Sequence, residues 1–193
     1  FPEIGPVIEN PIRSISEISS VKTKESSESM PYIREAIKLI KSSLPDNIPL
    51  IGFGGAPFTL TSYAIEGGSS KSYIYVKKLM SSHPKEFSEL MDKMTDSIID
   101  YLNYQILSGV DAIQVFDSWV GCLGVSDYEK HVYPHTKRLF ESLIKKVPII
   151  HFGTGNPALL RLMAAAGGDV MALDWRAPLK ESWNDLGCKS IQG

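Results

Sequence analysis

Apolar residues recur along the chain at two spacings, one typical of helices and the other typical of buried strands. A period of three to four residues indicates an amphipathic helix, and a short unbroken apolar run indicates a strand buried on both faces. The periodic segments, which we predict to be helices, span residues 32–44, 57–67, 71–80, 84–108, 126–146 and 158–166. The apolar runs, which we predict to be strands, span residues 49–53, 112–116, 147–152 and 170–173, and another strand begins at Ser190.

The alternation of strands and helices predicts an α/β fold built from parallel βαβ units. A doubly wound sheet and a (β/α)8 TIM-type barrel both satisfy this pattern. Glycine or polar residues follow successive strands, for example Asp117 and Ser118 after residues 112–116. Such residues form the ring of βα loops at the carboxyl face of a barrel, so we favour the barrel. Because a complete barrel takes ~250 residues or more, this chain would form a partial barrel, about strands 3 to 6 and the start of 7.

Residues 1–30 do not follow this pattern. Residues 1–12 are rich in proline, glycine and isoleucine, and residues 14–29 are mostly polar and rich in serine. Such a stretch has little to bury, and we predict a loop or a lid for it. Residues 31–193 would then form the βα units of a single domain. Since the chain begins with Phe1 rather than Met, we expect it to be the central portion of a longer protein.

Composition narrows the range of partners and compartments. The 193 residues are 43% hydrophobic and 22% charged, and the formal net charge is −2. This weak charge, with both signs interspersed, gives no field that would gather nucleic acid or an anionic membrane surface. No apolar run approaches the ~20 residues of a membrane helix. Cys122 and Cys188 lie far apart, which indicates neither a disulfide framework nor a cysteine-rich metal site and suits a reducing, cytoplasmic compartment.

The most informative segment spans residues 52–67 and has the sequence GFGGAPFTLTSYAIEG. Taken alone, it predicts a strand, a tight glycine turn and a helix that begins at Pro57, and close packing would explain its glycines. The segment also resembles a signature of the uroporphyrinogen decarboxylase family: GF, two small residues, any residue, P, an aromatic residue, TL, two residues, Y, two residues, E, and G or K. Every specified position matches. The resemblance continues, in order, through QVFDSWVG at 114–121, YP at 133–134, HFGTG at 151–155, VMALDW at 170–175 and QG at 192–193.

The resemblance implies a single-domain barrel that acts as a cytoplasmic homodimer and needs neither a metal nor another cofactor. The implied activity is the decarboxylation of the four acetate side chains of uroporphyrinogen III, which gives coproporphyrinogen III for haem or chlorophyll synthesis. The pyrrole ring itself serves as the electron sink. The protein must therefore supply arginines for the substrate carboxylates, a carboxylate that faces the pyrrole N–H groups, and acids that donate protons.

Matched residue by residue, the resemblance implies a catalytic and substrate-binding role for Tyr63, the signature tyrosine. It implies a hydrogen bond to substrate from Ser118 and an aromatic pocket wall from Phe116. For Asp117, a direct role and a buried, hydrogen-bonded strand end are both open. For Arg176, the alternatives are a contact with a substrate carboxylate and a structural role. The family's arginine-rich stretch RQAGR, its aspartate in FSD and its C-terminal histidine are expected outside this chain, so we predict that the 193 residues alone are inactive.

Other interpretations compete with this one. Residues 153–158, GTGNPA, satisfy the dinucleotide-binding pattern GxGxxA, and Asp174 follows at about the ~20-residue offset of a ribose-binding acid. The corrinoid, zinc-dependent methyltransferases share the decarboxylase fold, but they carry HxC where this chain has His151-Phe152-Gly153. Glycine lacks the thiolate that zinc prefers, so we expect no metal. A non-catalytic fragment that binds tetrapyrroles or assists assembly is the remaining alternative.

Overall fold

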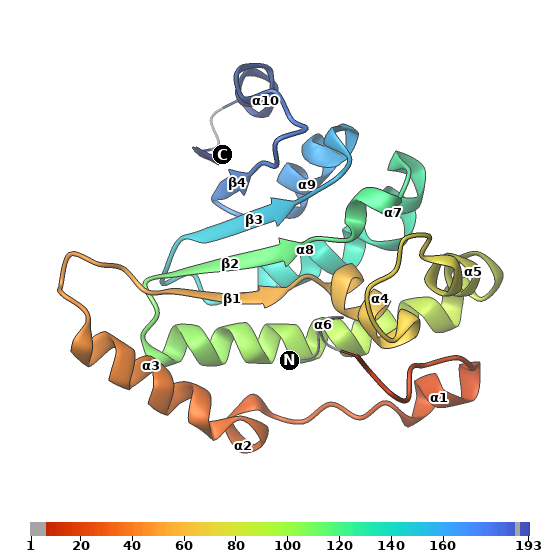
Figure 1. The fold of residues 1–193 in the computed structure, drawn as a ribbon, viewed down its shortest axis with the longest axis horizontal. Coiled ribbons are helices and arrows are strands. Elements are labelled where there is room, and N and C mark those ends of the chain that lie inside the picture. Colours follow the sequence, from red (N-terminus) through yellow and green to blue (C-terminus); the bar gives the residue numbers. More distant parts are fainter. Residues whose placement is uncertain (1–6, 188–189) are drawn as a thin grey trace.

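The computed structural model of the chain describes residues 7–187 and 190–193. Its centre is a parallel sheet in which the strands follow one another in sequence order (Figure 1). The register pairs Gly55 with Phe116 and Asp117 with Gly153, so the carboxyl ends of the first three strands lie level. The strands are β1 (Ile51–Gly55), β2 (Ala112–Asp117), β3 (Ile149–Gly153), β4 (Val170–Ala172) and β5 (Ser190–Gln192).

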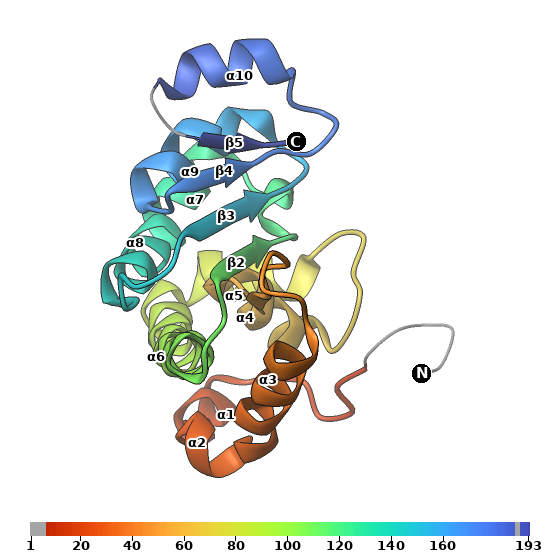
Figure 2. The ribbon, with the colours of Figure 1, turned by 90° about the vertical axis from the view of Figure 1, so that its left-hand side faces the viewer.

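Helices connect the strands and lie together on one face of the sheet. Figure 2 shows α6, α8 and α9 on the same side of the strands, whereas the other side of the strands is open. A doubly wound sheet carries helices on both faces, but the wall of a barrel carries them only outside. The predicted partial barrel is therefore confirmed. The connecting helices are α4 (Pro57–Glu66), α5 (Ile74–Ser82), α6 (Pro84–Ser108), α7 (Val125–His131), α8 (Tyr133–Ser142), α9 (Leu160–Ala166) and α10 (Leu179–Leu186), with 3-10 turns η1 (Val120–Cys122) and η2 (Pro157–Leu159).

Three helices precede β1: α1 (Ile15–Ser20), α2 (Ser26–Ser29) and α3 (Pro31–Ser43). The first two lie where the sequence predicts a loop or lid. The side chain of Ile18 is 1% exposed, and its carbonyl accepts a hydrogen bond of 2.8 Å from Lys93 Nζ. The Ser26 N–H donates to the Asp100 carboxylate at 2.6 Å. Both partners belong to α6, so distant contacts order a stretch whose own polarity gives no sign of structure.

Two apolar clusters fill the space between the sheet and its helices. One includes Phe58 and Phe87 near the carboxyl ends of the strands, and the other includes Leu102 and Ile113. α6 contributes to both clusters. It approaches β1 closely because Gly52 has no side chain: a Cβ there would lie 2.6 Å from Gln105 Oε1. Each large apolar side chain buried in this way contributes roughly 1.5–3 kcal/mol.

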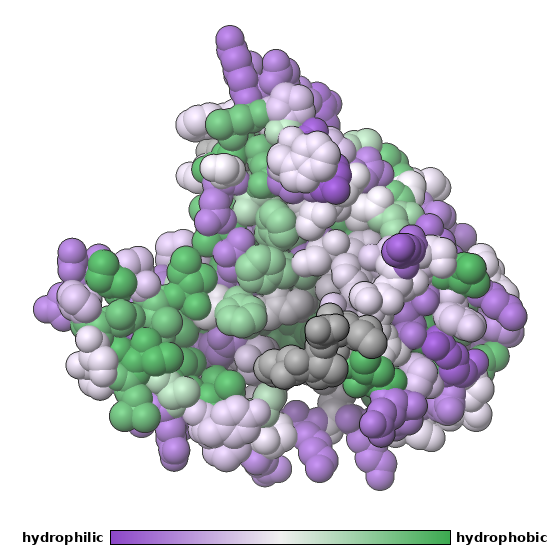
Figure 3. Space-filling model, in the orientation of Figure 1, coloured by the Kyte–Doolittle hydropathy of each residue, from purple (hydrophilic) through white to green (hydrophobic). Residues whose placement is uncertain are grey.

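The opposite face of the sheet is largely apolar and uncovered in the described residues. The side chain of Phe53 is 63% exposed there. The rings of Phe53, Phe116 and Phe152 meet edge to face, with centroid distances of 6.0 and 5.6 Å. Figure 3 looks onto this face and shows apolar residues over the strands and α3. In a closed barrel this face lines the interior, where side chains from the other strands cover it.

Two helical segments differ from the prediction. The predicted helix at 126–146 is interrupted at Val132, and α8 begins anew with Pro134 in its first turn. Proline has no N–H to continue the hydrogen bonds of a preceding helix, which accounts for the break. The sequence pattern did not predict α10. No helix in the described part of the chain combines the length and the apolar character that a membrane crossing requires.

Candidate active site

Most of the predicted site residues belong to the helix that follows β1, to the end of β2 and to the loop after β2, at the carboxyl end of the sheet (Figure 1). β1 runs into α4, which has Pro57 in its first turn, where a missing N–H costs nothing. The Ala56 N–H donates to the Phe116 carbonyl at 2.8 Å and joins this helix to the end of β2. α4 ends at Gly67, whose φ of 85° favours glycine. Tyr63 therefore projects from a short helix that is held at both ends.

Alternation along β2 sends its last side chains to opposite faces. Phe116 is half-buried on the open face, in contact with the phenylalanines of β1 and β3. The side chain of Asp117 points the other way and is 0% exposed. Ser118 follows the strand and is exposed. Phe116 and Ser118 are thus accessible at the mouth of the barrel, whereas the carboxyl group of Asp117 between them is buried.

The hydroxyl of Thr59 joins Asp117 to the following loop. It donates a hydrogen bond of 2.8 Å to Asp117 Oδ1. The same hydroxyl oxygen accepts the backbone N–H of Trp119 at 3.2 Å. One threonine of α4 therefore holds both ends of the three-residue stretch that contains Ser118.

Tyr63 is held by ring contacts. Its ring stacks on that of Trp119 with a centroid distance of 3.8 Å and an interplanar angle of 27°. The ring of Tyr73 meets the edge of the Trp119 ring at 5.3 Å. Burial raises the pKa of Tyr73, helped by the nearby Cys122, Tyr63 and Glu66, so this phenol stays protonated at neutral pH. The three rings form one wall beside the end of β2.

Burial dominates the electrostatics of this region. It raises the pKa of Asp117 from 3.8 to about 7, although the hydrogen bonds with Thr59 oppose the shift. Asp117 Oδ2 has no hydrogen-bond partner among the described residues. Burial also raises the pKa of the Cys122 thiol to about 11, despite the opposing charge of Lys77. The groups that surround the end of β2 therefore favour their neutral forms.

Arg176 lies apart from these residues, after β4. Its guanidinium group donates to Asp174 Oδ2 at 2.6 Å and lies over the ring of Trp175 at 4.4 Å. Burial opposes ionisation of Asp174, but hydrogen bonds from the N–H groups of Gly155 and Arg176 and from the Arg176 side chain outweigh it, so the pKa of Asp174 is lowered. Through its stack on Trp119, Tyr63 lies beside the stretch that contains Phe116, Asp117 and Ser118, whereas Arg176 forms an ion pair elsewhere on the mouth.

The dinucleotide pattern at 153–158 does not form a binding loop. Asp174 Oδ2, the expected ribose ligand, accepts the N–H of Gly155 at 2.9 Å. The Asn156 side chain accepts the N–H of Ala158 at 3.1 Å. The cavity along this loop has a volume of about 10 Å³, whereas ligand sites occupy roughly 300–1,000 Å³. The N–H groups of Gly155 and Ala158, which a pyrophosphate would need, are thus bonded within the chain itself.

The residues of β3 do not fit the zinc site of a methyltransferase. His151 is 0% exposed inside the sheet, with its ring centroid 4.6 Å from that of Phe140. A side chain at Gly153, the thiolate position, would overlap the end of Met163. Among residues 7–187 and 190–193, no group of three or more His, Cys, Asp or Glu is placed to hold a metal ion.

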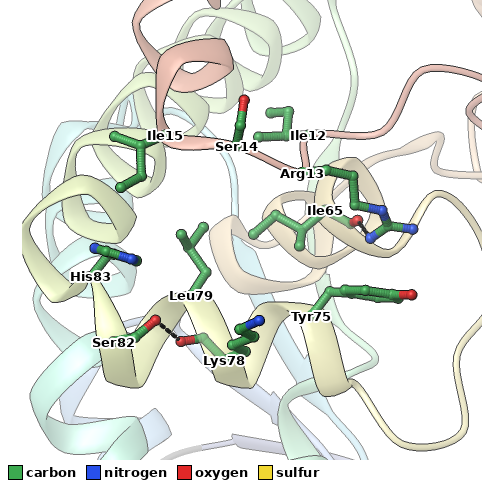
Figure 4. A pocket seen from close by; sticks show the side chains of 10 residues that line it. All are labelled: Ile12, Arg13, Ser14, Ile15, Ile65, Tyr75, Lys78, Leu79, Ser82 and His83. Carbon is green, nitrogen blue, oxygen red and sulfur yellow. Dashed lines mark hydrogen bonds between the residues drawn. The ribbon is translucent and has the colours of Figure 1, made fainter.

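A cavity of about 420 Å³ lies between α5, the end of α4 and the segment around Arg13 (Figure 4). The Arg13 guanidinium group donates to the carbonyls of Ile65 and Glu66 and lies over the ring of Tyr75 at 3.8 Å. This arginine therefore fastens the N-terminal segment to α4. None of the predicted site residues lines the cavity, and we assign it no part in the candidate active site.

Sequence analysis did not single out Thr59 or Trp119 as site residues. Both lie inside segments that resemble the family, but the signal for a role was weak, since a threonine in a first helical turn and a tryptophan after a strand are common. Thr59 and Tyr63 are four residues apart, which places them on the same face of α4. That spacing was the available clue that Thr59 faces the same region as Tyr63.

Comparisons with known proteins agree with this arrangement of strands and loops. The family model described as uroporphyrinogen decarboxylase (URO-D) matches residues 1–193. The uroporphyrinogen decarboxylase of Carboxydothermus hydrogenoformans is 50% identical over 191 residues, which are 98% of this chain and 55% of that protein. The protein of the same name from Citrifermentans bemidjiense is 43% identical over 190 residues, or 98% of this chain and 56% of that protein. The chain thus spans about half the length of these curated relatives.

A solved structure supports the fold alone. The methyltransferase from Methanosarcina mazei superposes with a TM-score of 0.73 at 19% sequence identity. The superposition covers 85% of this chain and 48% of the methyltransferase chain. At this identity the likeness says nothing of activity. The match of the family model to the whole chain, together with the signature around Tyr63, shows that the chain belongs to the uroporphyrinogen decarboxylase family.

Proposed function

We propose that the protein that carries this chain is a uroporphyrinogen decarboxylase, which converts the acetate side chains of uroporphyrinogen III to methyl groups and yields coproporphyrinogen III. The observation that carries this proposal is 50% identity to a protein of that name across 98% of the chain. The matched region includes Tyr63, Phe116 and Ser118, which the structure gathers at the carboxyl end of β1 and β2. This is the end at which barrel enzymes have their active sites.

The chemistry needs proton donors and an electron sink, and the substrate supplies the sink. A proton adds to a pyrrole carbon next to the one that bears the acetate arm. The electrons of the bond to the carboxylate carbon then flow into the protonated ring as carbon dioxide leaves. A second proton adds to the remaining methylene carbon to form the methyl group, and the ring releases the first proton. Each arm therefore consumes one proton and releases one carbon dioxide.

The residues of this chain would bind and orient the substrate. We propose that Tyr63 contacts the reacting tetrapyrrole through its hydroxyl, because its ring lies at the mouth and is held by Trp119. Ser118 is exposed beside it and would donate a hydrogen bond to substrate. Phe116 would form part of an apolar wall on the open face. The ion pair with Asp174 supports a structural role for Arg176.

The proposal extends to the oligomeric state, the cofactors and the cellular compartment of the protein. We propose a cytoplasmic homodimer that works without a metal or another cofactor. The family resemblance supports the dimer and the lack of a cofactor, and the distant pair Cys122 and Cys188 suits a reducing compartment. The arginines, the pyrrole-facing aspartate and the histidine of the family would come from outside these 193 residues, so we expect no turnover from this chain alone.

The direct test is an assay of the purified protein that carries this chain. Uroporphyrinogen III is incubated anaerobically, and the products are oxidised and separated as porphyrins by chromatography. Coproporphyrin should accumulate through intermediates with seven, six and five carboxyl groups. Unchanged uroporphyrin, with a folded protein confirmed by circular dichroism, would contradict the proposal. The isolated 193-residue chain serves as the control that should not react.

A further inference from the structure

Four residues, Thr59, Tyr63, Asp117 and Trp119, are linked by contacts between α4 and the end of β2, in an arrangement that we call the circuit. Thr59 and Tyr63 lie one helical turn apart on α4, and Asp117 and Trp119 flank Ser118. The Thr59 hydroxyl contacts both flanking residues, through Asp117 Oδ1 and the Trp119 N–H. The stack of Tyr63 on Trp119 closes the circuit. A shift of any one member therefore disturbs the others.

Asp117 is the member whose position needs an explanation. Its side chain is 0% exposed, so it cannot touch a substrate that lies at the mouth of the barrel. It has no ion-pair partner among the described residues, and only Oδ1 has a hydrogen-bond partner there. A buried carboxyl group is costly unless its contacts compensate. The contact it does make leads through Thr59 to the predicted site residues.

We propose that Asp117 is a positioning residue, which holds the Tyr63 ring and the exposed Ser118 in place through Thr59 and the backbone of Trp119. This inference rests on the proposed function for its kinetic consequence, because the residues it positions are those of the proposed decarboxylase site. Its structural consequence, an ordered pair of rings, does not depend on that function.

The hydrogen-bond chain has a direction that explains how a buried acid can act at a distance. Because the Thr59 proton is committed to Asp117, a lone pair of the hydroxyl oxygen is left for the Trp119 N–H. Trp119 has φ −109° and ψ −4°, close to the sparsely populated bridge region, where surrounding contacts decide the conformation. Holding this N–H therefore restrains the backbone from which the indole ring projects, and Tyr63 stacks on that ring.

Asp117 is also the group in this circuit that changes charge near neutral pH. Burial raises the pKa of Asp117 to about 7. The neighbouring titratable groups are the Cys122 thiol of η1 and the Tyr128 phenol of α7, and burial raises the pKa of both, so they stay neutral. Loss of the proton leaves a charge on a carboxylate with one unpaired oxygen and strengthens its bond with Thr59. The surroundings of the Trp119 ring should therefore change as Asp117 ionises.

Fluorine NMR of the protein that carries this chain, labelled with 5-fluorotryptophan, tests the inference. The Trp119 resonance is assigned by its absence in Trp119→Phe. We expect its chemical shift to titrate with a midpoint near the raised pKa of Asp117, about 7. In Asp117→Asn, which keeps an acceptor for Thr59 and cannot ionise, the resonance should stay near its low-pH position at every pH. A Trp119 resonance that titrates unchanged in Asp117→Asn would overturn the inference.

A second pair of variants tests the hydrogen bonds without the charge. Thr59→Val removes the hydroxyl with little change of shape, and Thr59→Ser keeps it. We expect Thr59→Val to shift and broaden the Trp119 resonance and Thr59→Ser to restore it. Thr95→Val is the matched control, because the hydroxyl of this buried threonine bonds only to its own helix, at Met91. A Thr59→Val spectrum as close to wild type as that of Thr95→Val would overturn the inference.

Kinetics separates this inference from the proposed function. In an active decarboxylase, Thr59→Val should lower kcat/KM about 2- to 10-fold, the effect of one hydrogen bond, with Thr59→Ser near wild type. Unchanged kcat/KM in Thr59→Val would show that the positioning of the rings through Thr59 does not contribute to catalysis. If no variant, including wild type, converts uroporphyrinogen, the proposed function fails. The fluorine spectra would still decide whether Asp117 positions the rings.

Discussion

At the scale of single residues, Tyr63 is held by its ring, which stacks on Trp119 at 3.8 Å. Tyr63→Phe keeps this stack and deletes one polar group, so the melting temperature should stay near wild type. If the hydroxyl contacts the tetrapyrrole in the transition state, kcat/KM should fall about 5- to 150-fold, from the loss of roughly 1–3 kcal/mol. Ser118→Ala should cost less, because water can replace an exposed hydroxyl. Wild-type kcat/KM in Tyr63→Phe would assign the tyrosine to structure alone.

The raised pKa of Asp117 also predicts how stability depends on pH. The folded state holds the proton up to pH of about 7, whereas the unfolded chain releases it near 3.8. Between these values the unfolded state binds fewer protons, so the free energy of unfolding should fall as pH rises, by up to roughly 4 kcal/mol. Asp117→Asn cannot ionise and should lack this fall. Urea unfolding of both proteins at pH 5 and pH 8 measures most of this fall, and an equal change in the free energy of unfolding between these pH values in the two proteins would contradict the prediction.

Sequence analysis identified Tyr63, Phe116 and Ser118 as site candidates from the family pattern alone, and it left Asp117 undecided. The alternation of side chains along β2 explains why Asp117 is buried, because Asp117 faces the same side as the buried Ile113 and Val115. Its hydrogen bond to Thr59, however, joins residues 58 positions apart. No local pattern carries such a contact, because it depends on how α4 packs over the end of β2. The stacking of Tyr63 on Trp119 could not be predicted either, because it also depends on how α4 packs over the end of β2.

At the scale of elements, α6 and α8 meet around a buried histidine. His135 Nδ1 lies 3.1 Å from Asp92 Oδ1, and Nε2 lies 3.4 Å from the Ser88 hydroxyl. Arg138 also contacts Asp92, at 3.1 Å. Burial lowers the pKa of His135, and the opposing influence of Asp92 does not reverse the shift. The folded state therefore favours the neutral imidazole.

This histidine gives the packing of α6 on α8 a dependence on pH opposite to that of Asp117. The stabilising effect of a neutral His135 is present above the pKa of a histidine in the unfolded chain, about 6.5, and is lost as pH falls towards the lower folded value. This contribution opposes that of Asp117, so between pH 7.5 and 5.5 wild type should lose free energy of unfolding relative to His135→Gln. The exposed His83 offers a control, His83→Gln, that should follow wild type. An identical pH dependence in all three proteins would be the contrary result.

The sequence predicted elements best where their own residues decide them. The bounds of α6 agree with the predicted 84–108, because a long apolar stripe lies between Pro84 and Gly109. α1 and α2 were missed because their order depends on hydrogen bonds with distant residues: Lys93 donates to α1, and Asp100 accepts from α2. α10 was missed because its apolar residues are few, and Trp183 is 53% exposed. Periodicity thus detected the helices that bury a broad face and failed where the buried face is small.

At the scale of the whole molecule, the sheet has an apolar face and two unpaired edges within the described residues. Strand order makes β1 and β5 the edges of the sheet. Ile51 and Phe53 of β1 are 42% and 63% exposed on the open face. Parallel strands of this kind are normally buried on both faces, and an unpaired edge offers N–H and C=O groups to other chains. Alternation of strands and helices, together with the glycine and polar residues that follow the strands, was enough to predict a partial barrel, but it could not show how much apolar surface the arrangement leaves open.

The 193-residue chain, expressed alone, should therefore associate with itself. We expect low solubility, or oligomers in sedimentation velocity at micromolar concentration, because pairing of edges and burial of the open face stabilise association. Phe53→Lys places a charge on the open face at the edge strand and should reduce association. Lys78→Glu, on the exposed surface of α5, is a control that changes charge elsewhere and should not reduce it. A monodisperse monomer with one cooperative thermal transition would contradict the prediction and would show that this half-length unit is stable without a covering surface.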